Sequence, residues 1–240
     1  EGSETRSSLM WETVHIIQQM GDWKPRYVIW ENVKNVLSKY MVGNFNMYLQ
    51  EMAKMGYSNS FEILDARDFG LPQARKRVFT ISVLGNNPFD FSDLLKKPMG
   101  NIKEYLLSDD EVGEQYTIVS PSMTRKIDPR NYDNNELGKL SVIRNYSFTI
   151  TCNQDRCPNA GIVKRESGSY RLLTELECWR LQGYLDIDYL SALSKNPGIP
   201  GRKNSTLYKQ AGNSIPVPIF ESIFQKIILG QTKQTVNHPA

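Results

Sequence analysis

The spacing of apolar residues in the first third of the chain predicts a layer of helix and strand. Leu9, Val14 and Ile17 recur at helical spacing, and Gly21 can end that helix in the left-handed conformation. The short apolar run at 27–30 is typical of a strand that is buried on both faces. A helix followed by a buried strand is the start of an α/β fold.

The same layer continues with a second helix and two more strands. Apolar residues at helical spacing over 45–55 predict the helix, and Gly56 follows it. Residues 61–64 and 78–83 are apolar runs typical of strands. Because a Rossmann-like sheet usually has about six strands, these three predict only part of such a sheet.

Beyond this layer the periodic pattern weakens and then returns. Residues 86–170 are polar and rich in turn formers, with a short strand expected at 147–151. Thr174 and Glu177 form a capping box that starts a new helix.

The chain closes on a helix expected over 217–229, which has a broad apolar face and ends at Gly230. The return of regular order predicts that one domain is interrupted by another. We therefore expect an α/β domain in two segments, 1–85 and 171–240, with a smaller lobe of residues 86–170 inserted.

Composition places the chain among ordinary globular proteins. Of its 240 residues, 40% are hydrophobic and 23% are charged, which are the proportions of a soluble domain. No apolar run reaches the length of a membrane span, and the first residues do not resemble a secretory signal. Three cysteines without a framework spacing predict a reducing compartment. We therefore expect a cytoplasmic protein with no membrane partner.

The net charge of +3 is small, but basic residues are concentrated in one region. Residues 125–171 contain nine lysines and arginines against five acidic residues. Such an excess suits a polyanionic partner, for which Arg125, Lys126 and Arg165 are candidate contacts. A solvated basic face without a ligand explains the same charges equally well.

The first chemical candidate is Glu31, which directly follows the strand expected at 27–30. Ligands of open α/β sheets collect at the carboxyl ends of strands. A partly desolvated carboxyl group there holds a proton more readily, and it could share that proton with a substrate nitrogen. A helix-capping or salt-bridged glutamate is the alternative.

A basic loop precedes the third expected strand. It reads QARKR over 73–77 and follows the turn sequence GLP. Arg75 and Arg77 would point to the same side of an extended segment. Two planar guanidinium groups there would suit a phosphate, a carboxylate or a base carbonyl oxygen. A solvated basic loop is the alternative, and it is favoured when this loop is considered alone.

Two further strings are unusually specific in their residue order. Residues 171–184 read RLLTELECWRLQGY, a capped helix that ends at Gly183. Residues 212–218 read GNSIPVP and predict a tight turn before the last helix. The N-terminus of that helix could bind an anion or a polar ligand.

Taken together and in this order, these strings resemble the conserved blocks of the cytosine-5 DNA methyltransferase family. ENV at 31–33 is similar to the family's ENV block, and QARKR at 73–77 is similar to its Q-x-R-x-R block. The strings at 171–184 and 212–218 are similar to its R-x-L-T-x-x-E-x-x-R-L-Q-G and G-N-S-V-P-V blocks. ETRSSL at 4–9 loosely resembles its D-x-R-G-x-L block. Only the second lobe is left unmatched.

Two blocks of the family have no counterpart in this sequence. They are the glycine-rich F-x-G-x-G loop, which holds S-adenosylmethionine, and the Pro-Cys block, whose thiolate attacks the cytosine. Cys157 precedes Pro158 in the reverse order, and Cys178 lies at a position that the family does not use catalytically. Cys152 and Cys157 have no histidine nearby, so we expect no metal site.

The resemblance implies an α/β fold with a partial Rossmann-like methyltransferase sheet. It also implies methyl transfer from S-adenosylmethionine to carbon 5 of a flipped-out cytosine. Glu31 would protonate or hydrogen-bond ring nitrogen 3, Arg77 would hold the exocyclic oxygen, and Arg75 would brace the loop or a phosphate.

The resemblance implies that segments 1–85 and 171–240 form a catalytic domain and that residues 86–170 form a target-recognition lobe. It assigns cofactor contacts to the α/β domain and DNA recognition to the inserted lobe. Leu9, Asn213 and Ser214 would close the cofactor side, where binding of S-adenosylmethionine is incomplete. The inserted lobe would read the bases that flank the target in the major groove of double-stranded DNA.

The resemblance further implies a partner that carries the absent residues. This partner would be the N-terminal half of a methyltransferase, on the same parent chain or as a separate subunit of a split enzyme. We expect the chain alone to be inactive, and the system to be a bacterial or phage-encoded restriction-modification enzyme. Uncovered apolar faces and an open strand edge would also favour self-association. A non-catalytic DNA-binding or regulatory remnant is the alternative, although such a remnant has no need for base-polarising residues.

Overall fold

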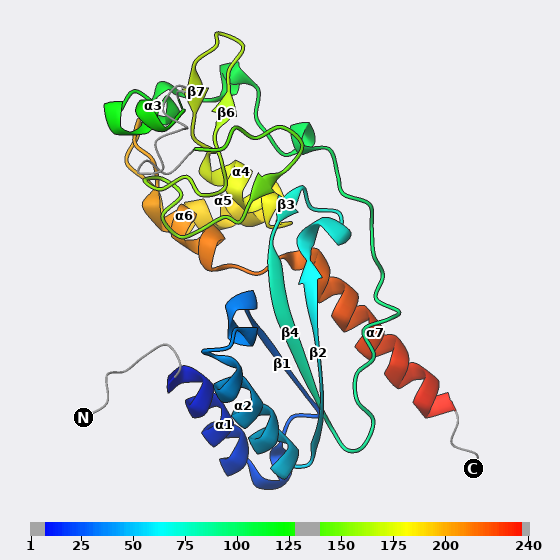
Figure 1. Ribbon diagram of the computed structural model, residues 1–240. Helices are drawn as coiled ribbons and strands as arrows, with labels where there is room; N and C mark the ends of the chain where they lie inside the picture. The colour runs from blue at the N-terminus through cyan, green and yellow to red at the C-terminus, as the bar shows by residue number, and fades with distance from the viewer. Residues whose placement is uncertain (1–7, 128–139, 237–240) are drawn as a thin grey trace. The chain divides into compact units, whose positions relative to one another are not determined.

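The computed structural model describes residues 8–127 and 140–236 (Figure 1). These residues gather in two compact units. Each unit has a buried apolar cluster of its own.

The first unit is built on a three-stranded antiparallel sheet, and it comprises the described residues of Glu1–Asp65 and Lys76–Leu94. The strand order is β1 (Tyr27–Val33), β4 (Lys76–Leu84) and β2 (Tyr57–Asp65). Both outer strands run antiparallel to β4. The last strand in the sequence is therefore the central strand of the sheet.

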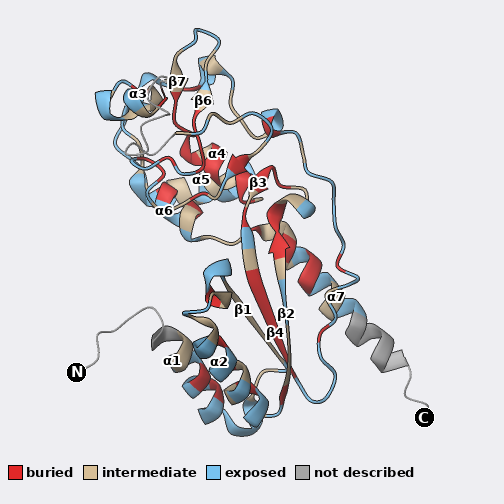
Figure 2. Cartoon of the chain, in the orientation of Figure 1, coloured by how far each residue is buried: buried red, intermediate tan, exposed pale blue. Residues whose placement is uncertain are grey.

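β4 is the buried strand of this sheet, as Figure 2 shows. It is paired on both edges, and its residues 78–83 are all buried. The expectation that residues 27–30 form a strand buried on both faces is wrong, because β1 is only half-buried along these residues. β1 lies at an edge, where it has one strand neighbour among the described residues.

Two helices pack against this sheet. α1 (Ser8–Gln19) contacts α2 (Val42–Lys54), which in turn contacts β2. Periodicity predicted both helices, and Gly21 (φ +55°) and Gly56 (φ +90°) follow them in the left-handed region as expected. The core that they share contains Val14, Ile17, Val36, Phe45, Tyr48, Met52, Tyr57 and Val78.

The second unit is mainly helical, and it comprises the described residues of Ala66–Arg75 and Leu95–Ala240. Its helices are α3 (Pro121–Ile127), α4 (Glu175–Leu181), α5 (Asp186–Lys195), α6 (Ser205–Asn213) and α7 (Val217–Val236). Two small sheets pair β3 (Gln73–Ala74) with β5 (Ser147–Phe148) in parallel, and β6 (Val163–Lys164) with β7 (Tyr170–Arg171) antiparallel. Short 3₁₀ helices occur across the two units at Gly21–Trp23, Lys34–Leu37, Ala66–Asp68, Ile102–Glu104, Asp109–Glu111 and Glu114–Tyr116.

The start of α4 is a buried polar cap. The Thr174 hydroxyl accepts the Glu177 amide at 3.2 Å, and Glu177 Oε2 accepts the Thr174 amide at 2.7 Å, which confirms the predicted capping box. Glu177 also pairs with Arg171 through two bonds of 2.8 and 2.9 Å, and neither side chain is more than 1% exposed. Removing one partner would leave an unpaired buried charge, which costs about 3–5 kcal/mol. Leu173 and Cys178 flank the cap in the apolar core.

The end of the chain differs from the expectation. α7 continues to Val236 and does not stop at Gly230. The first two residues of the expected turn at 212–218 are the last residues of α6, and the apolar pattern predicted neither α5 nor α6. No helix in the described ranges is long and apolar enough to cross a membrane.

The compact units do not follow the predicted domain boundaries. Side chains of α4 and α6 share a core with Ile102, Ile150 and Ala160, which come from the expected lobe of residues 86–170. The assignment of residues 1–85 and 171–240 to catalysis, and of the lobe to target recognition, concerns function and stays a prediction.

Gly212 lets α6 approach the backbone of residues 151–152 closely. A Cβ atom at position 212 would lie 2.2 Å from the Cys152 amide nitrogen, whereas one at Gly43 in α2 would meet nothing within 4 Å. We expect Gly212→Ala to lower the free energy of unfolding by about 1–3 kcal/mol because it overpacks this contact. Gly43→Ala should raise that free energy by up to about 1 kcal/mol. Urea denaturation measures both, and equal effects would contradict the close approach at Gly212.

Candidate active site

Glu31 and Arg77 face each other across β1 and β4. Arg77 Nε lies 3.1 Å from Glu31 Oε1, and the two side chains are 14% and 21% exposed respectively. Val33 pairs with Arg77 and Glu31 pairs with Phe79, so the charged residues are diagonal neighbours on one face of the sheet. A register slip of one residue would send one of them to the opposite face. Strand pairing therefore fixes this ion pair.

Partial burial sets the electrostatics of the pair. Burial lowers the pKa of the Arg77 guanidinium, and the neighbouring Glu31 carboxylate opposes that shift. Arg77 Nη1 also donates to the Lys76 carbonyl at 2.9 Å, which fixes the plane of the guanidinium. A carboxyl group beside a planar cation offers two adjacent donors whenever the carboxyl is protonated.

Arg75 lies in the break between β3 and β4 and does not share a face with Arg77. It is 4% exposed, its Nη1 donates to Ile150 O at 3.2 Å, and its Nη2 donates to Ser214 O at 2.7 Å. These residues belong to the second unit, whereas Arg77 belongs to the first. The expectation that both guanidinium groups face one ligand is wrong, because Arg75 is held by carbonyls of its own unit. Such contacts suit a residue that braces the loop.

Gln73 and Gln182 connect the matched blocks through buried hydrogen bonds. Gln73 Nε2 donates to Leu181 O at 2.8 Å, and its Oε1 accepts the Ile150 amide at 3.1 Å. Gln182 Nε2 donates to Ala211 O at 2.7 Å. Both glutamines are fully buried, so these bonds satisfy groups that water does not reach. The Val217 amide also donates to Gln182 O at 2.9 Å, so three of the strings that resemble the family are joined in one network.

The turn after α6 carries two groups expected on the cofactor side. Asn213 is exposed, and its Oδ1 accepts a hydrogen bond from Cys152 Sγ, so its amide nitrogen is the group left to donate to a ligand. The Ser214 hydroxyl lies 2.6 Å from the Tyr184 hydroxyl. An exposed amide next to a fixed hydroxyl fits the polar atoms of a cofactor. Leu9 lies in α1, and its role stays a prediction.

The cysteine in the apolar core, Cys178, is not activated as a nucleophile. Cys178 is fully buried, and burial raises the pKa of its thiol, which makes the thiolate rare. Cys152 donates to Asn213, and Cys157 is exposed. Among the residues that the structure describes, no cluster of histidine, cysteine or acidic side chains could hold a metal ion.

The candidate DNA contacts differ in their surroundings. Arg125 and Lys126 lie in the last turn of α3, where Arg125 is exposed and its Nε donates to Pro121 O at 3.2 Å. Arg165 is turned toward the protein: its side chain is 9% exposed, and its Nη2 donates to Val112 O at 3.3 Å. The contacts of Arg165 are those of a structural residue, and DNA binding by all three stays a prediction.

Sequence reasoning missed the roles of Gln182, Tyr184 and Cys152. Tyr184 and Cys152 contact the expected site residues Ser214 and Asn213, and Gln182 bonds to Gln73 of the basic loop. Gln182 and Tyr184 lie inside the string at 171–184, so their polar chemistry was visible in the sequence. Cys152 gave no signal, because its partner Asn213 is 61 positions away.

Comparison with known proteins agrees with the order of the blocks. Residues 2–229 match the family model described as C-5 cytosine-specific DNA methylase. The chain belongs to this family. The Type II methyltransferase M2.ScrFI of Lactococcus lactis subsp. cremoris is 34% identical to it, over 95% of this chain and 61% of the relative. The Type II methyltransferase M.DsaV of Dactylococcopsis salina is 28% identical, over 94% and 62%. The chain therefore spans about three fifths of the length of these relatives.

Solved structures confirm the predicted methyltransferase fold. The S. pombe Dnmt2 methyltransferase superposes with a TM-score of 0.71 at 15% identity, over 95% of this chain and 74% of that one. The Entamoeba histolytica methyltransferase EhMeth superposes with a TM-score of 0.64 at 18% identity, over 91% and 69%. Both similarities show the fold, a partial Rossmann-like methyltransferase of mixed α and β structure.

Arg75 and Arg77 provide a matched test of the two environments. Arg75→Met leaves buried carbonyls of Ile150 and Ser214 without their donor, so we expect the free energy of unfolding to fall by about 2–4 kcal/mol. Arg77→Met removes an ion pair whose side chains retain some contact with solvent, so it should cost less, about 1–2 kcal/mol. Urea denaturation followed by circular dichroism measures both losses. Equal losses in the two variants would contradict the separate roles.

Proposed function

We propose that the chain is part of an enzyme that methylates carbon 5 of a cytosine flipped out of double-stranded DNA, with S-adenosylmethionine as the methyl donor. The family match and the Type II methyltransferases among its relatives support this proposal, and they favour a cytoplasmic restriction-modification system. The observation that carries it is the Glu31–Arg77 pair. In this proposal the chain supplies base-polarising and DNA-recognition residues and does not supply the nucleophile.

The pair would act where electron density develops in the ring. Carbon 5 of cytosine is a poor nucleophile until a thiolate adds to carbon 6. That addition moves electrons toward ring nitrogen 3 and the exocyclic oxygen. Protonated Glu31 would donate to the nitrogen and Arg77 would donate to the oxygen, which stabilises the developing charge. Carbon 5 then takes the methyl group. Loss of the carbon 5 proton to a base or a water molecule of the completed site, with return of the nitrogen 3 proton to Glu31, expels the thiolate and restores the ring.

S-adenosylmethionine would bring an electrophilic methyl group to this reaction. The residues of this chain that fit it are Asn213, through its exposed amide, and Ser214, whose hydroxyl is held by Tyr184. Leu9 is a third candidate. These residues bind and orient only part of such a molecule, so further contacts would come from the complementary half.

The attacking thiolate would belong to that complementary half, on the same parent chain or on a separate subunit. The burial of Cys178 supports this assignment. Ile16 and Trp23 are 60% and 86% exposed, and they offer apolar surface to the complementary half or to a second copy of the chain. The alternative, a non-catalytic DNA-binding remnant, would leave the Glu31–Arg77 pair without a substrate.

Glu31→Gln tests the proton donor, because glutamine keeps the shape of the side chain and cannot transfer a proton. In the enzyme completed with its other half, we expect the methylation rate to fall ~100- to 10,000-fold, with DNA affinity nearly unchanged. Glu62→Gln, at an exposed position on β2, is the matched control. Arg77→Ala should lower the methylation rate similarly. Arg77→Lys should recover only part of that rate, since an ammonium group lacks the planar fork of a guanidinium group. If the Glu31→Gln enzyme turned over at a near-normal rate, the role of Glu31 would be structural and not catalytic.

The isolated chain should not methylate DNA, because none of its cysteines is placed as the attacking group in this proposal. The measurement is transfer of labelled methyl groups from S-adenosylmethionine to DNA, by the chain alone and with the complementary half added. Robust transfer by the chain alone would overturn the assignment of the nucleophile.

Arg125 and Lys126 should contact phosphates of the DNA backbone. Replacing both with alanine should weaken binding of every duplex sequence. The slope of the logarithm of the binding constant against the logarithm of the salt concentration should fall in magnitude by about 1.8, because two phosphate contacts are lost. Lys39 and Lys54, exposed lysines of the first unit, serve as the control pair. If the slope changes equally in both double variants, the α3 residues make no special contact.

A further inference from the structure

A shallow hollow in the second unit is lined mainly by cations. Its volume is about 560 Å³, and its lining residues are Arg67, Asp68, Lys96, Lys97, Pro98 and Met99. None of them is a residue that the family blocks single out. Three positive charges against one carboxylate give this hollow a net attraction for anions.

The two segments that form the hollow are joined by backbone hydrogen bonds. The Lys97 amide donates to Asp68 O at 3.0 Å, and the Gly100 amide donates to Gly70 O at 2.9 Å. Phe69 and Lys97 form a parallel bridge between the same segments. The lysines are therefore held at a fixed position beside the loop, although their side chains extend into solvent.

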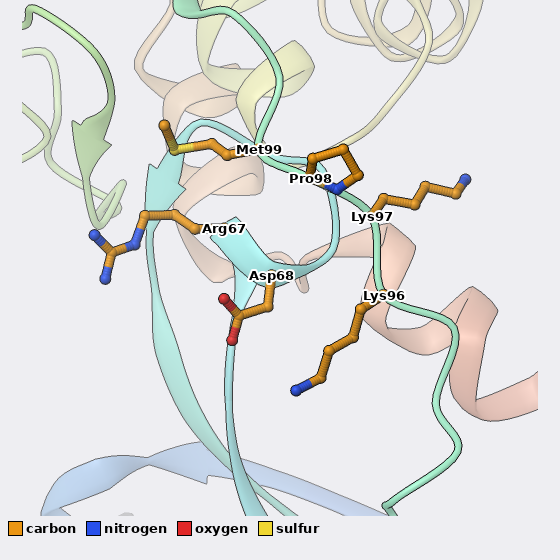
Figure 3. Close-up of a pocket in the computed structure, with 6 residues that line it drawn as sticks. All are labelled: Arg67, Asp68, Lys96, Lys97, Pro98 and Met99. Atoms are coloured by element: carbon orange, nitrogen blue, oxygen red, sulfur yellow. The ribbon is translucent and has the colours of Figure 1, made fainter.

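The cations of the hollow spread and do not converge on one point. Lys96 and Asp68 extend into the same space, whereas Arg67 and Lys97 leave it on opposite sides (Figure 3). A compact anion would be bound by donors that converge on it. A row of separated cations instead suits successive phosphates of a nucleic-acid strand.

An aromatic ridge adjoins the hollow at Arg67. The Arg67 guanidinium lies over the Tyr146 ring at 4.9 Å, and Tyr146 meets Phe148 edge to face at 5.9 Å. Phe148 is 45% exposed, although it is a large apolar residue. Aromatic rings beside arginine and lysine are the usual means of holding sugars and bases next to a charged backbone.

This surface is tied to the loop that carries the glutamine and arginine of the matched block. β5 runs parallel to β3, with Phe148 opposite Ala74 and Ser147 opposite Gln73. The Ser147 amide also donates to Pro72 O at 2.9 Å. A strand of DNA on this surface would therefore lie next to the Gln73–Arg75 loop.

We propose that Arg67, Lys96, Lys97 and Phe148 form a second DNA-contacting surface, separate from Arg125 and Lys126. The cations contact consecutive phosphates, and the Phe148 ring packs on a sugar of the same strand. This inference rests on the proposed function, since it takes double-stranded DNA as the substrate.

The test compares variants of the full 240-residue chain by fluorescence anisotropy with labelled duplex DNA over a range of salt concentrations. Lys96→Gln with Lys97→Gln should weaken binding about tenfold and reduce the logarithmic salt slope by about 1.8. Lys195→Gln with Lys209→Gln removes the same charge from exposed positions on α5 and α6, and it should have a smaller effect on both quantities. Asp68→Asn should tighten binding about twofold to fivefold, because it removes a charge that repels phosphate.

The Phe148→Leu variant separates the contribution of the aromatic ring to DNA affinity from that of the positive charges. It should weaken binding without changing the salt slope, because no phosphate contact is lost. Inorganic tripolyphosphate should compete only weakly, since a compact anion cannot span the separated cations. Strong competition by tripolyphosphate would replace the DNA proposal with a small-anion site.

The outcomes also separate this inference from the proposed function. If duplex DNA is bound even at low salt neither by the chain nor by the enzyme completed with its other half, both are overturned. A second outcome is that DNA is bound and that replacing Arg125 and Lys126 weakens binding. If the double variant of Lys96 and Lys97 then binds DNA as its control variant does, only the second surface is overturned. Unchanged melting temperatures of all variants establish that folding is intact.

Discussion

Buried donors and acceptors need partners inside the protein, and in the second unit Gln73 and Arg75 meet this need for three distant segments of the chain. Their side chains bond to backbone groups of Ile150, Leu181 and Ser214, which lie far away in the sequence. Losing any of these partners leaves a desolvated polar group, at a cost of about 1–3 kcal/mol. The network therefore fixes β5, the end of α4 and the turn after α6 around one short loop. The proposed cofactor residues and the second DNA surface both depend on that arrangement.

Much of what resembles the family consists of residues that hold the fold together. Arg171 and Glu177 neutralise each other in the core, and Glu177 also completes the cap of α4. Gly212 permits a backbone contact that any side chain would block. Fewer groups are left accessible to a ligand, among them Glu31, Arg77 and Asn213. Strand pairing or the structural residues hold the neighbours of each of these groups in place.

Arg75 and Arg77 show how strongly environment decides the role of a residue type. They are two positions apart, yet one donates to buried carbonyls and the other pairs with a partly exposed carboxylate. The break between β3 and β4 separates them, so the alternation rule for an extended strand does not apply across it. Buried bonds make Arg75 important for stability, whereas partial exposure leaves Arg77 able to meet a substrate.

The sequence alone determined the features that depend on near neighbours: the helices α1 and α2, the glycines that follow them, the capping box at Thr174, and the family, through the order of its blocks. Only the tertiary structure decided the central place of β4, the inward turn of Arg75, the bond between Cys152 and Asn213, and the pairing that sets Phe148 beside Ala74. Each of these joins residues that are distant along the chain. Periodicity and capping report interactions within a few residues, so they carry no information about which distant backbone or side chain will satisfy a buried group.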